Sequence, residues 1–389
     1  MKLAIATTAI SILVIGTLST SPTRGGGDVI SNGGSKRFGK RPSADATIET
    51  LLFTDARFAE GHRLFDKPFH RSEGLGVPEM NADSCRACHQ DPVIGGAGGL
   101  ELNVSRYGHE AGGVFSNVPG GQGLSKLYPP YVEGREEHDP GTANVFEQRQ
   151  TPSVLGDGLI DGISDSTILA NEDPTDANLD GIFGVARILT VDGQPEVGRF
   201  GWKGQIPRLA DFVRDAMGGE LGITTPDDGR GFAFLSDADN VSDPEIPERD
   251  VTLLAYFLSN LPAPERKGGT DPGIAAGETV FGSVGCATCH IPSLAGADGP
   301  VDLYSNLLLH NVMPPGYRGM SEPGAEMGFF QTPPLWGISD TAPYMHDGRA
   351  SNLEAAILAH DGEAAGVIAD YQLLTLQEQS DLLLFLEDL

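Results

Sequence analysis

Apolar positions recur with the period of an α-helix at two corresponding places in the 389-residue chain. The pattern Leu-x-x-Phe-Leu-x-x-Leu occurs at 254–261 and again at 382–389. Residues three and four apart lie on one face of a helix, so both segments are predicted to be amphipathic helices. Pro262 and Pro264 follow the first segment, and we expect that helix to end before them.

A second repeated pattern places a glycine four residues before a phenylalanine. It occurs as Gly61 and Phe65 in the first half of the chain and as Gly277 and Phe281 in the second. This spacing places the two side chains of each pair on one helical face. Each half also contains Thr-Pro-x-x-x-Gly. Together these matches predict that the chain consists of two halves built alike.

Each Gly-x-x-x-Phe helix is followed by the sequence Cys-x-x-Cys-His. The first copy is Cys85, Cys88 and His89, and the second is Cys286, Cys289 and His290. Two cysteines that can form thioethers, followed directly by a histidine that can reach the iron, are typical of a c-type haem attachment site. A single copy could also be half of a zinc or redox site. Two copies use all four cysteines, so we predict two covalently bound haem c groups.

These patterns predict a mainly α fold with two cytochrome-c-like helical domains and long irregular loops. The N-terminal domain is placed at 48–264, with a long insertion between its haem turn and its closing helix, and the C-terminal domain at 265–389. Strand signals are sparse. Residues 185–191 could form one short strand, and the segment 100–150 is broken by glycine and proline and is predicted to be loop.

The N-terminal segment and the charge indicate where the protein works. Residues 1–22 resemble a secretory signal peptide, with a retained N-terminal anchor as the alternative, and 23–47 are predicted to be a flexible linker. No later segment is apolar enough to predict a stable membrane span. The net charge of −28 argues against nucleic acid and anionic membranes as partners. A periplasmic or otherwise exported protein is expected, which agrees with covalent haem attachment.

Several longer motifs resemble a known family. The run at 332–348 ends in Tyr-Met-His-Asp-Gly. This run and the run at 352–360 resemble sequences of the bacterial di-haem cytochrome c peroxidase superfamily. The runs at 198–205 and 307–311 resemble its di-haem oxidoreductase branch. The resemblance covers residues 50–389. It implies a peroxidase-like oxidoreductase that accepts electrons from a redox protein, such as a small cytochrome or cupredoxin, and reduces a small oxidant such as hydrogen peroxide.

Two other functions stay open at this point. One is a non-catalytic electron-transfer cytochrome, in which both irons are six-coordinate. The other is a haem enzyme that oxidises a partner protein through a surface residue. The iron ligands distinguish the first of these from a peroxidase, because peroxide needs an open coordination position.

The resemblance also suggests sixth ligands for the two irons. The family's methionine or tyrosine ligand of the C-terminal haem corresponds to His360 in this sequence, which implies a haem with two histidine ligands. Met345, His346 and a surface position for His360 are the alternatives. For the N-terminal haem, His109 is near the family's displaceable histidine, and an open or water-bound iron is the alternative. The remaining histidines considered for this position are His62, His70 and His138.

Two further residues correspond to functional positions of the family. Trp202 matches the tryptophan that relays electrons between the haems, with an ordinary core tryptophan as the alternative. Glu220 matches the glutamate that transfers protons to and from bound peroxide, with a solvated helix-end glutamate as the alternative. Trp336 is expected to have a packing role.

The sequence Asp176-x-Asn178-x-Asp180-Gly181 resembles the first half of a calcium-binding loop. The twelfth position is Arg187, so the complete loop pattern fails. The sequence therefore predicts either a Ca²⁺ site or a solvated acidic turn.

Overall fold

The computed structural model describes residues 43–76, 81–112, 114–116, 124–125, 143–237 and 239–389. The predicted signal peptide and nearly all of the predicted linker lie outside the described residues. The first helix, α1 (Ser43–Thr54), begins inside the segment 23–47, so the predicted linker extends too far toward the C-terminus.

Helices and short strands alternate along the described part of the chain. The further helices are α2 (Ala56–Asp66), α3 (Asp157–Asp161), α4 (Asp165–Leu169), α5 (Leu209–Ala216), α6 (Glu248–Ser259), α7 (Pro272–Ser283), α8 (Leu353–Leu358), α9 (Ala365–Leu373) and α10 (Leu376–Asp388). Short 3₁₀ turns are η1 (Arg71–Glu73), η2 (Leu100–Leu102), η4 (Cys286–Thr288), η5 (Ile338–Asp340) and η6 (Gly362–Ala364), and η3 (Met217–Leu221) is a π-helical turn.

The strands form several small antiparallel sheets. They are β1 (Val104–Ala111), β2 (Val114–Ser116), β3 (Leu124–Ser125), β4 (Val145–Arg149), β5 (Ile188–Val191), β6 (Gln194–Val197), β7 (Leu294–Gly296), β8 (Gly299–Val301), β9 (Leu309–Asn311) and β10 (Phe329–Gln331). Strand β1 pairs with β2, β3 and β4, and the other strands pair as β5–β6, β7–β8 and β9–β10. The structure is therefore a mixture of helices and small sheets, and the expectation of a mainly α fold is met only in part.

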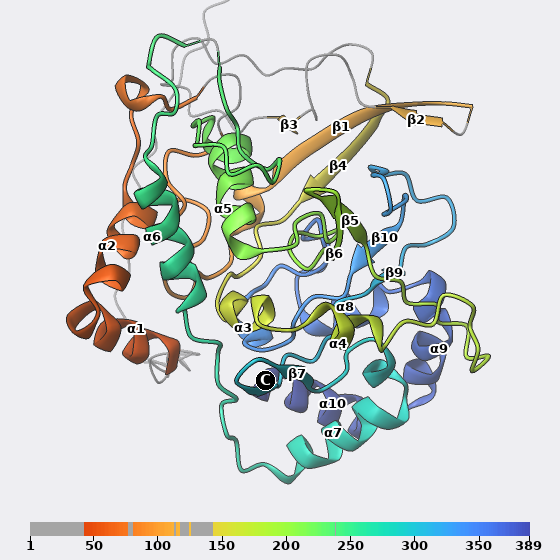
Figure 1. The fold of residues 1–389 in the computed structure, drawn as a ribbon. Helices are drawn as coiled ribbons and strands as arrows, with labels where there is room; N and C mark the ends of the chain where they lie inside the picture. Colours follow the sequence, from red (N-terminus) through yellow and green to blue (C-terminus); the bar gives the residue numbers. More distant parts are fainter. Residues whose placement is uncertain (1–42, 77–80, 113, 117–123, 126–142, 238) are drawn as a thin grey trace, which may run out of the picture. The chain divides into compact units, whose positions relative to one another are not determined.

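The prediction of loop for the segment 100–150 is wrong. Strands β1 and β4 both lie in it and pair with Tyr107 opposite Phe146, as Figure 1 shows in orange and yellow. The two strands are far apart in sequence, and their pairing depends on a contact that local composition does not reveal. In contrast, β5 confirms the short strand expected within 185–191, with its start at Ile188.

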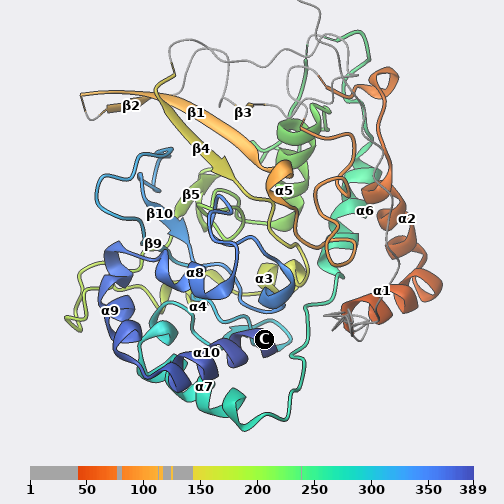
Figure 2. The same ribbon diagram turned by 180° about the vertical axis from the view of Figure 1, so that it is seen from behind.

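The repeated Gly-x-x-x-Phe pattern corresponds to a repeated helix crossing. In the first half, α2 packs on α6, and a Cβ atom added to Gly61 would lie 2.3 Å from the carbonyl oxygen of Leu253. In the second half, α7 packs on α10, and a Cβ atom on Gly277 would lie 1.9 Å from the carbonyl oxygen of Asp381. Figures 1 and 2 show both pairs side by side. Both glycines are required because the partner backbone occupies the space of a side chain.

The buried apolar side chains form two clusters that follow these helix pairs. The larger cluster includes Phe58 and Phe257, and the smaller includes Phe281 and Phe385. The larger cluster also takes in Leu303 and its neighbours Leu307 and Leu308 from the second half of the sequence. The two halves therefore share part of one core, and the domain boundary at 264 stays a prediction. In the described part of the chain, no helix has the length and apolar character needed to cross a membrane.

Asp157, the first residue of α3, makes stability dependent on pH. Burial, and secondarily the charge of Asp161, raise the pKa of Asp157 to about 8 from 3.8. The folded protein therefore holds this proton at pH values where the unfolded chain has lost it. The stabilising effect is complete below about pH 4 and is lost as the pH rises through about 8.

We therefore expect the free energy of unfolding to fall by about 1.4 kcal/mol or more between about pH 5 and about pH 8, since one pKa unit corresponds to about that energy. Urea unfolding at a series of pH values measures the fall, and Asp157→Asn should remove most of it. Asp370→Asn, at an exposed position of α9, is the matched control. An equal pH dependence in Asp157→Asn and the parent protein would contradict the prediction.

Candidate haem-binding sites

The second Cys-x-x-Cys-His sequence folds as a tight turn at the end of α7. Cys286 begins η4, and Gly285 before it has φ 101°, a left-handed conformation that favours glycine. The Nδ1–H of His290 donates a hydrogen bond to the carbonyl of Tyr304 at 2.9 Å. Burial lowers the pKa of His290 to about 4, so its ring is neutral. With the proton on Nδ1, the lone pair of Nε2 is available to a metal.

The first Cys-x-x-Cys-His sequence has the same construction. The Nδ1–H of His89 donates to the carbonyl of Pro152 at 2.9 Å, and burial lowers the pKa of His89 to about 4. The side chain of Thr151 hydrogen-bonds to Cys88. All four cysteines are free of disulfides. The repeated motif thus gives two turns, each with two free thiols and one histidine whose Nε2 can bind iron.

A cavity of about 250 Å³, with mostly apolar walls, adjoins the second turn. Its lining brings together residues that the sequence had singled out separately, namely Trp202, Cys286, Cys289, His290, Trp336, Met345, His346 and His360. An apolar cavity with two thiols and histidine nitrogens on its walls fits a covalently attached haem.

His360 follows the end of α8 and has the same hydrogen-bonding pattern at Nδ1 as His89 and His290. Its Nδ1 hydrogen-bonds to the carbonyl of Ala356 at 2.7 Å, which leaves Nε2 available. His290 and His360 both line the cavity, and burial is the main cause that lowers the pKa of His290. This geometry favours His360 as the second axial ligand, which stays a prediction.

The alternative ligands of the C-terminal haem have different surroundings. His346 is buried, and its Nε2 lies 3.0 Å from the hydroxyl of Tyr317. The ring of His346 also stacks on Phe330, with ring centroids 3.8 Å apart. Its Nε2 therefore has a protein partner. Met345 lines the cavity and has φ 70°, in the left-handed region.

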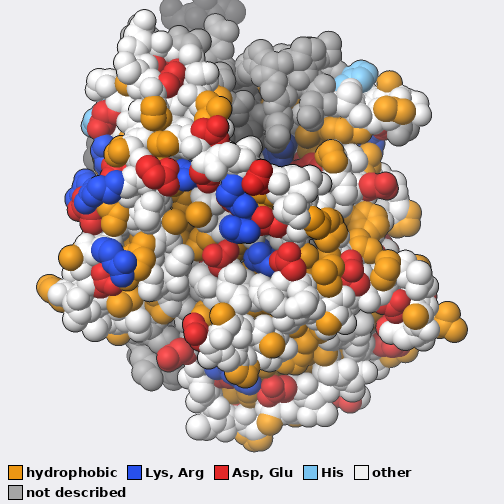
Figure 3. Space-filling model, viewed as in Figure 1, with side chains coloured by type: hydrophobic (Ala, Val, Ile, Leu, Met, Phe, Trp, Pro, Cys, Tyr) orange, Lys and Arg blue, Asp and Glu red, His pale blue; other side chains and the backbone are white. Residues whose placement is uncertain are grey.

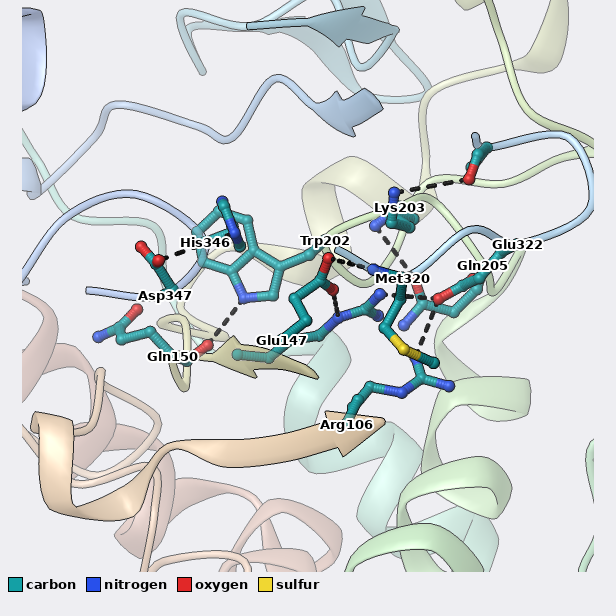
Figure 4. Close-up of polar contacts among 12 residues, drawn as sticks. Arg106, Glu147, Gln150, Trp202, Lys203, Gln205, Met320, Glu322, His346 and Asp347 are labelled. Atoms are coloured by element: carbon teal, nitrogen blue, oxygen red, sulfur yellow. Dashed lines mark hydrogen bonds and ion pairs between the residues drawn. The ribbon is translucent and has the colours of Figure 1, made fainter. Parts of the chain in front are cut away.

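Trp202 lies where the two predicted haem sites meet. Its Nε1–H donates to the carbonyl of Gln150 at 2.8 Å (Figure 4). Gln150 and Pro152 both line the C-terminal cavity, while the carbonyl of Pro152 holds His89 of the N-terminal site. The tripeptide 150–152 therefore contacts both sites, and Trp202 is hydrogen-bonded to it.

The residue after Trp202 fixes the tryptophan in place. Lys203 is completely buried, and its Nζ donates to the carbonyls of Glu326 and Phe329 at 2.9 and 2.8 Å. Burial lowers the pKa of Lys203 to about 8. The carbonyl of Trp202 accepts from the backbone N–H of Gln331 at 2.8 Å. This anchoring keeps the indole at one position in the cavity wall.

A buried ionic cluster beside Lys203 escaped the sequence analysis. Glu322 accepts hydrogen bonds from three guanidinium groups at 2.7–2.9 Å, those of Arg106, Arg149 and Arg187 (Figure 4). Burial alone would raise the pKa of Glu322, but these arginines hold it well below its usual range. The cluster ties β1 and β4 to the loop between β9 and β10. No local motif marks these residues, which meet only in the folded chain.

Glu220 lies in the π-helical turn η3, next to the N-terminal haem motif. Its carboxylate accepts from the side-chain amide of Asn81 at 2.6 Å, and its backbone carbonyl accepts from the N–H of the same residue. After burial, the charge of Glu220 is the next cause that raises the pKa of Cys88 to about 12. The structure therefore brings Glu220 near the first attachment turn.

Asp215 is a second acidic residue close to this site, and the sequence analysis did not assign it a role. Burial, followed by the charge of Glu220, raises its pKa to about 6. Asp215 lies on α5 and Glu220 on the turn that continues it.

The candidates for the sixth ligand of the N-terminal haem are scattered. His109 lies in β1 opposite Ser116 of β2, and Figures 1 and 2 show this end of the sheet on the side away from α2 and α6. His62 packs edge-on against Phe257, His70 is exposed, and His138 is outside the described residues. Both His109 ligation and an open iron stay predictions.

The predicted calcium loop folds as a series of turns in which carboxylates accept from backbone amides. Asp173 accepts from Ala177 N at 2.8 Å, and Asp180 accepts from Ile182 N at 2.9 Å. Among the described residues, the carboxylates grouped closely enough for a cation belong to another segment, at Asp237, Asp243 and Glu245. Calcium binding stays a prediction.

Comparison with known proteins gives the class. Residues 143–389 match the family model described as "Di-haem oxidoreductase, putative peroxidase", and the chain belongs to this family. The protein is therefore a di-haem, peroxidase-like oxidoreductase, as the motifs suggested. No curated protein matches the chain.

Solved structures with detectable similarity include two proteins of related description. One is a MauG-like protein associated with microbial copper homeostasis, with 18% identity over 86% of this chain and 88% of that chain and a TM-score of 0.43. Another is a variant of the di-haem peroxidase BthA from Burkholderia thailandensis, with 15% identity, 90% and 86% coverage and a TM-score of 0.42. Hydrazine synthase of Kuenenia stuttgartiensis has 16% identity, 97% and 100% coverage and a TM-score of 0.39.

Proposed function

We propose that the protein is an exported di-haem c-type cytochrome that reduces a small oxidant, such as hydrogen peroxide, at its N-terminal haem site. Covalent attachment to the two cysteine pairs and export to the periplasm are part of this proposal. Reduction of peroxide to two water molecules takes up two electrons and two protons. Bound haem supplies the one-electron redox chemistry, and the chain's own residues position the groups and move the protons.

The observation that carries this proposal is the difference between the two sites. The C-terminal cavity has a second histidine, His360, beside His290, with its Nε2 available. Two histidine ligands would close that iron to substrates and suit it to electron transfer. The N-terminal site has a carboxylate, Glu220, near Cys88, and this carboxylate accepts a hydrogen bond from the side-chain amide of Asn81 at 2.6 Å. A carboxylate near an open iron can take a proton from peroxide and return it to the leaving oxygen.

Trp202 supports an electron path between the sites. It lies in the wall of the C-terminal cavity and is bound to the tripeptide whose Pro152 carbonyl holds His89. An indole ring is large, polarizable and oxidisable, which suits it to a relay. The net charge of −28 is compatible with a basic redox protein as the electron donor, such as a small cytochrome or cupredoxin.

The ligand assignment predicts the spectra of the resting protein. We expect the C-terminal haem to be low-spin and unaffected by peroxide, and the N-terminal haem to respond to peroxide, as measured by optical and electron paramagnetic resonance (EPR) spectroscopy. His360→Ala should convert the C-terminal haem to a high-spin species, because it removes one axial ligand. His70→Ala, at an exposed histidine, is the matched control.

The possible results separate the candidate functions. If both irons are low-spin and peroxide perturbs neither, the protein is an electron-transfer cytochrome and the peroxidase proposal fails. If His360→Ala leaves the low-spin signal of the C-terminal haem unchanged, His360 is not its ligand. Haem that dissociates in acidified acetone would contradict covalent attachment.

A further inference from the structure

Aromatic side chains make consecutive ring contacts from the C-terminal cavity toward the surface. Trp202 and His346 both line the cavity, and their ring centroids are 6.5 Å apart at an interplanar angle of 75°. The ring of His346 in turn contacts Tyr317, at 5.8 Å and 88°. Tyr317 lies in the loop between β9 and β10. Tryptophan and tyrosine side chains are readily oxidised. These contacts therefore connect two redox-capable side chains, Trp202 and Tyr317, through the imidazole of His346.

The hydroxyl of Tyr317 has two bases within reach. It lies 3.0 Å from Nε2 of His346 and 3.2 Å from Oε2 of Glu147. Both distances fall within the range for direct proton transfer. The phenol O–H donates to the carboxylate of Glu147, which is therefore placed to take up its proton. Burial, followed by the charge of Glu147, raises the pKa of Tyr317 above its usual range, so the phenol is protonated at rest.

The groups around this pair hold the phenol in position. The guanidinium of Arg349 lies over the Tyr317 ring, 5.6 Å from its centroid, and an oxygen of Asp347 is 4.0 Å from Nε2 of His346. Gly319 leaves room for the hydrogen bonds, since a Cβ atom there would lie 2.5 Å from the Tyr317 hydroxyl and 2.5 Å from Oε2 of Glu147. Figure 4 shows His346 beside Trp202, with Asp347 next to it.

Tyr317 lies between the buried network and the protein surface. It is half-buried, while Pro314, Pro315, Gly316 and Arg318 next to it are exposed. Figure 3 shows one face of the molecule, where charged and apolar side chains alternate without a single dominant patch. The exposed neighbours of Tyr317 place its phenol within reach of a donor at the surface, and Trp202 and His346 line the cavity behind it.

We propose that Tyr317 is a redox-active residue that passes single electrons to the C-terminal haem site through His346 and Trp202. In the oxidation step the O–H bond of Tyr317 breaks. The electron passes through His346 to Trp202, and the proton crosses the hydrogen bond to Oε2 of Glu147, which gives a neutral tyrosyl radical. A one-electron donor at the surface then reduces the radical, and the proton returns from Glu147. Two such electrons, with two protons from solvent, reduce one hydrogen peroxide to two water molecules. The oxidant is hydrogen peroxide, acting through the proposed function on which this inference rests.

The hydrogen bond of the Tyr317 hydroxyl explains why this tyrosine can be oxidised. A tyrosine that loses an electron becomes strongly acidic, so oxidation is easiest where a base takes the proton at the same time. Glu147 is this base, because it accepts the hydrogen bond from the Tyr317 hydroxyl. His346 provides the ring contact between Tyr317 and Trp202 and is a positioning residue, and Tyr317 is the redox residue.

The test oxidises the intact holoprotein in two independent ways. One sample is mixed with hydrogen peroxide, and another is photo-oxidised with ruthenium tris(bipyridine) and a sacrificial electron acceptor. Samples frozen during either reaction should give a tyrosyl radical by EPR, narrowed when the protein carries ring-deuterated tyrosine. Tyr317→Phe should reduce this signal about tenfold or more.

The matched control is Tyr256→Phe, which removes another half-buried phenol that donates to a carboxylate, that of Asp55 at 2.5 Å. This variant should keep the radical signal. Formation of the radical should be slower in D₂O than in H₂O, and His346→Gln should lower its yield, because glutamine removes the ring contact between Tyr317 and Trp202. Circular dichroism and the resting haem spectra check that each variant is folded.

The possible outcomes test the role of Tyr317 and the proposed peroxidase function separately. A full radical signal in Tyr317→Phe, or its loss in Tyr256→Phe, would overturn the assignment to Tyr317. If peroxide changes the haem spectrum but neither method gives a radical on Tyr317, the inference fails and the peroxidase function stands. If only photo-oxidation gives the radical and peroxide leaves both haems unchanged, the proposed function fails and the redox role of Tyr317 stands.

Discussion

Glu220→Gln should lower kcat/KM for hydrogen peroxide by about 100-fold or more while the spectra of both haems stay unchanged. The size of the loss follows from the usual contribution of a positioned general acid–base group. Glutamine keeps an oxygen that can accept the hydrogen bond from Asn81, now 2.6 Å from Glu220, but it cannot transfer a proton. Steady-state peroxide reduction, with a small-molecule electron donor, measures the effect.

The control for this variant is Glu354→Gln, an exposed glutamate in α8, which should keep full activity. Full peroxide turnover in Glu220→Gln would remove the acid–base role from Glu220. Asp215 would then be the next residue to test, since its pKa of about 6 also suits a proton carrier near neutral pH.

Gly277→Ala should destabilise the protein by about 3 kcal/mol, the upper part of the usual range for overpacking a well-packed contact. The added Cβ atom would lie 1.9 Å from the carbonyl oxygen of Asp381 and 2.8 Å from Cβ of Phe385. Both are parts of α10 that a side-chain rotation cannot move. The helices α7 and α10 must therefore separate, which opens the smaller core cluster. Denaturant unfolding measures the change.

Gly282→Ala is the matched control because Gly282 lies in the same helix with no atom near the added Cβ. It should be neutral or stabilising by up to about 1 kcal/mol, because alanine is the better helix former. Equal effects of the two substitutions would show that helix propensity, rather than the close crossing with α10, decides stability at Gly277.

The features that the sequence could predict depend on residues that are close together in the chain. The stripe at 382–389 predicts α10 because apolar spacing and helix period agree. The two Cys-x-x-Cys-His sequences predict both attachment turns because the chemistry needs all three side chains within five residues. In both cases the residues that determine the structure are neighbours in the chain.

The features that the sequence could not predict depend on partners far along the chain. Strand β1 exists because Tyr107 and its neighbours pair with β4, and β4 follows a long intervening segment. The carbonyls that orient His89 and His290 belong to Pro152 and Tyr304, and a backbone carbonyl has no residue-type signal. The arginines around Glu322 come from β1, β4 and the segment before β5, so no window of sequence contains the cluster.

The tripeptide 150–152 has a consequence for how the two haem sites influence each other. Its Pro152 carbonyl sets the hydrogen bond of His89, while its Gln150 carbonyl holds Trp202 in the wall of the other cavity. A displacement of this short segment therefore changes the basicity of one iron ligand and the environment of the other site together. Such an interaction energy is reciprocal by thermodynamic necessity. With haems bound at both sites as proposed, reduction of one centre would shift the potential of the other by the same energy in either direction, and the two midpoint potentials would belong to the pair.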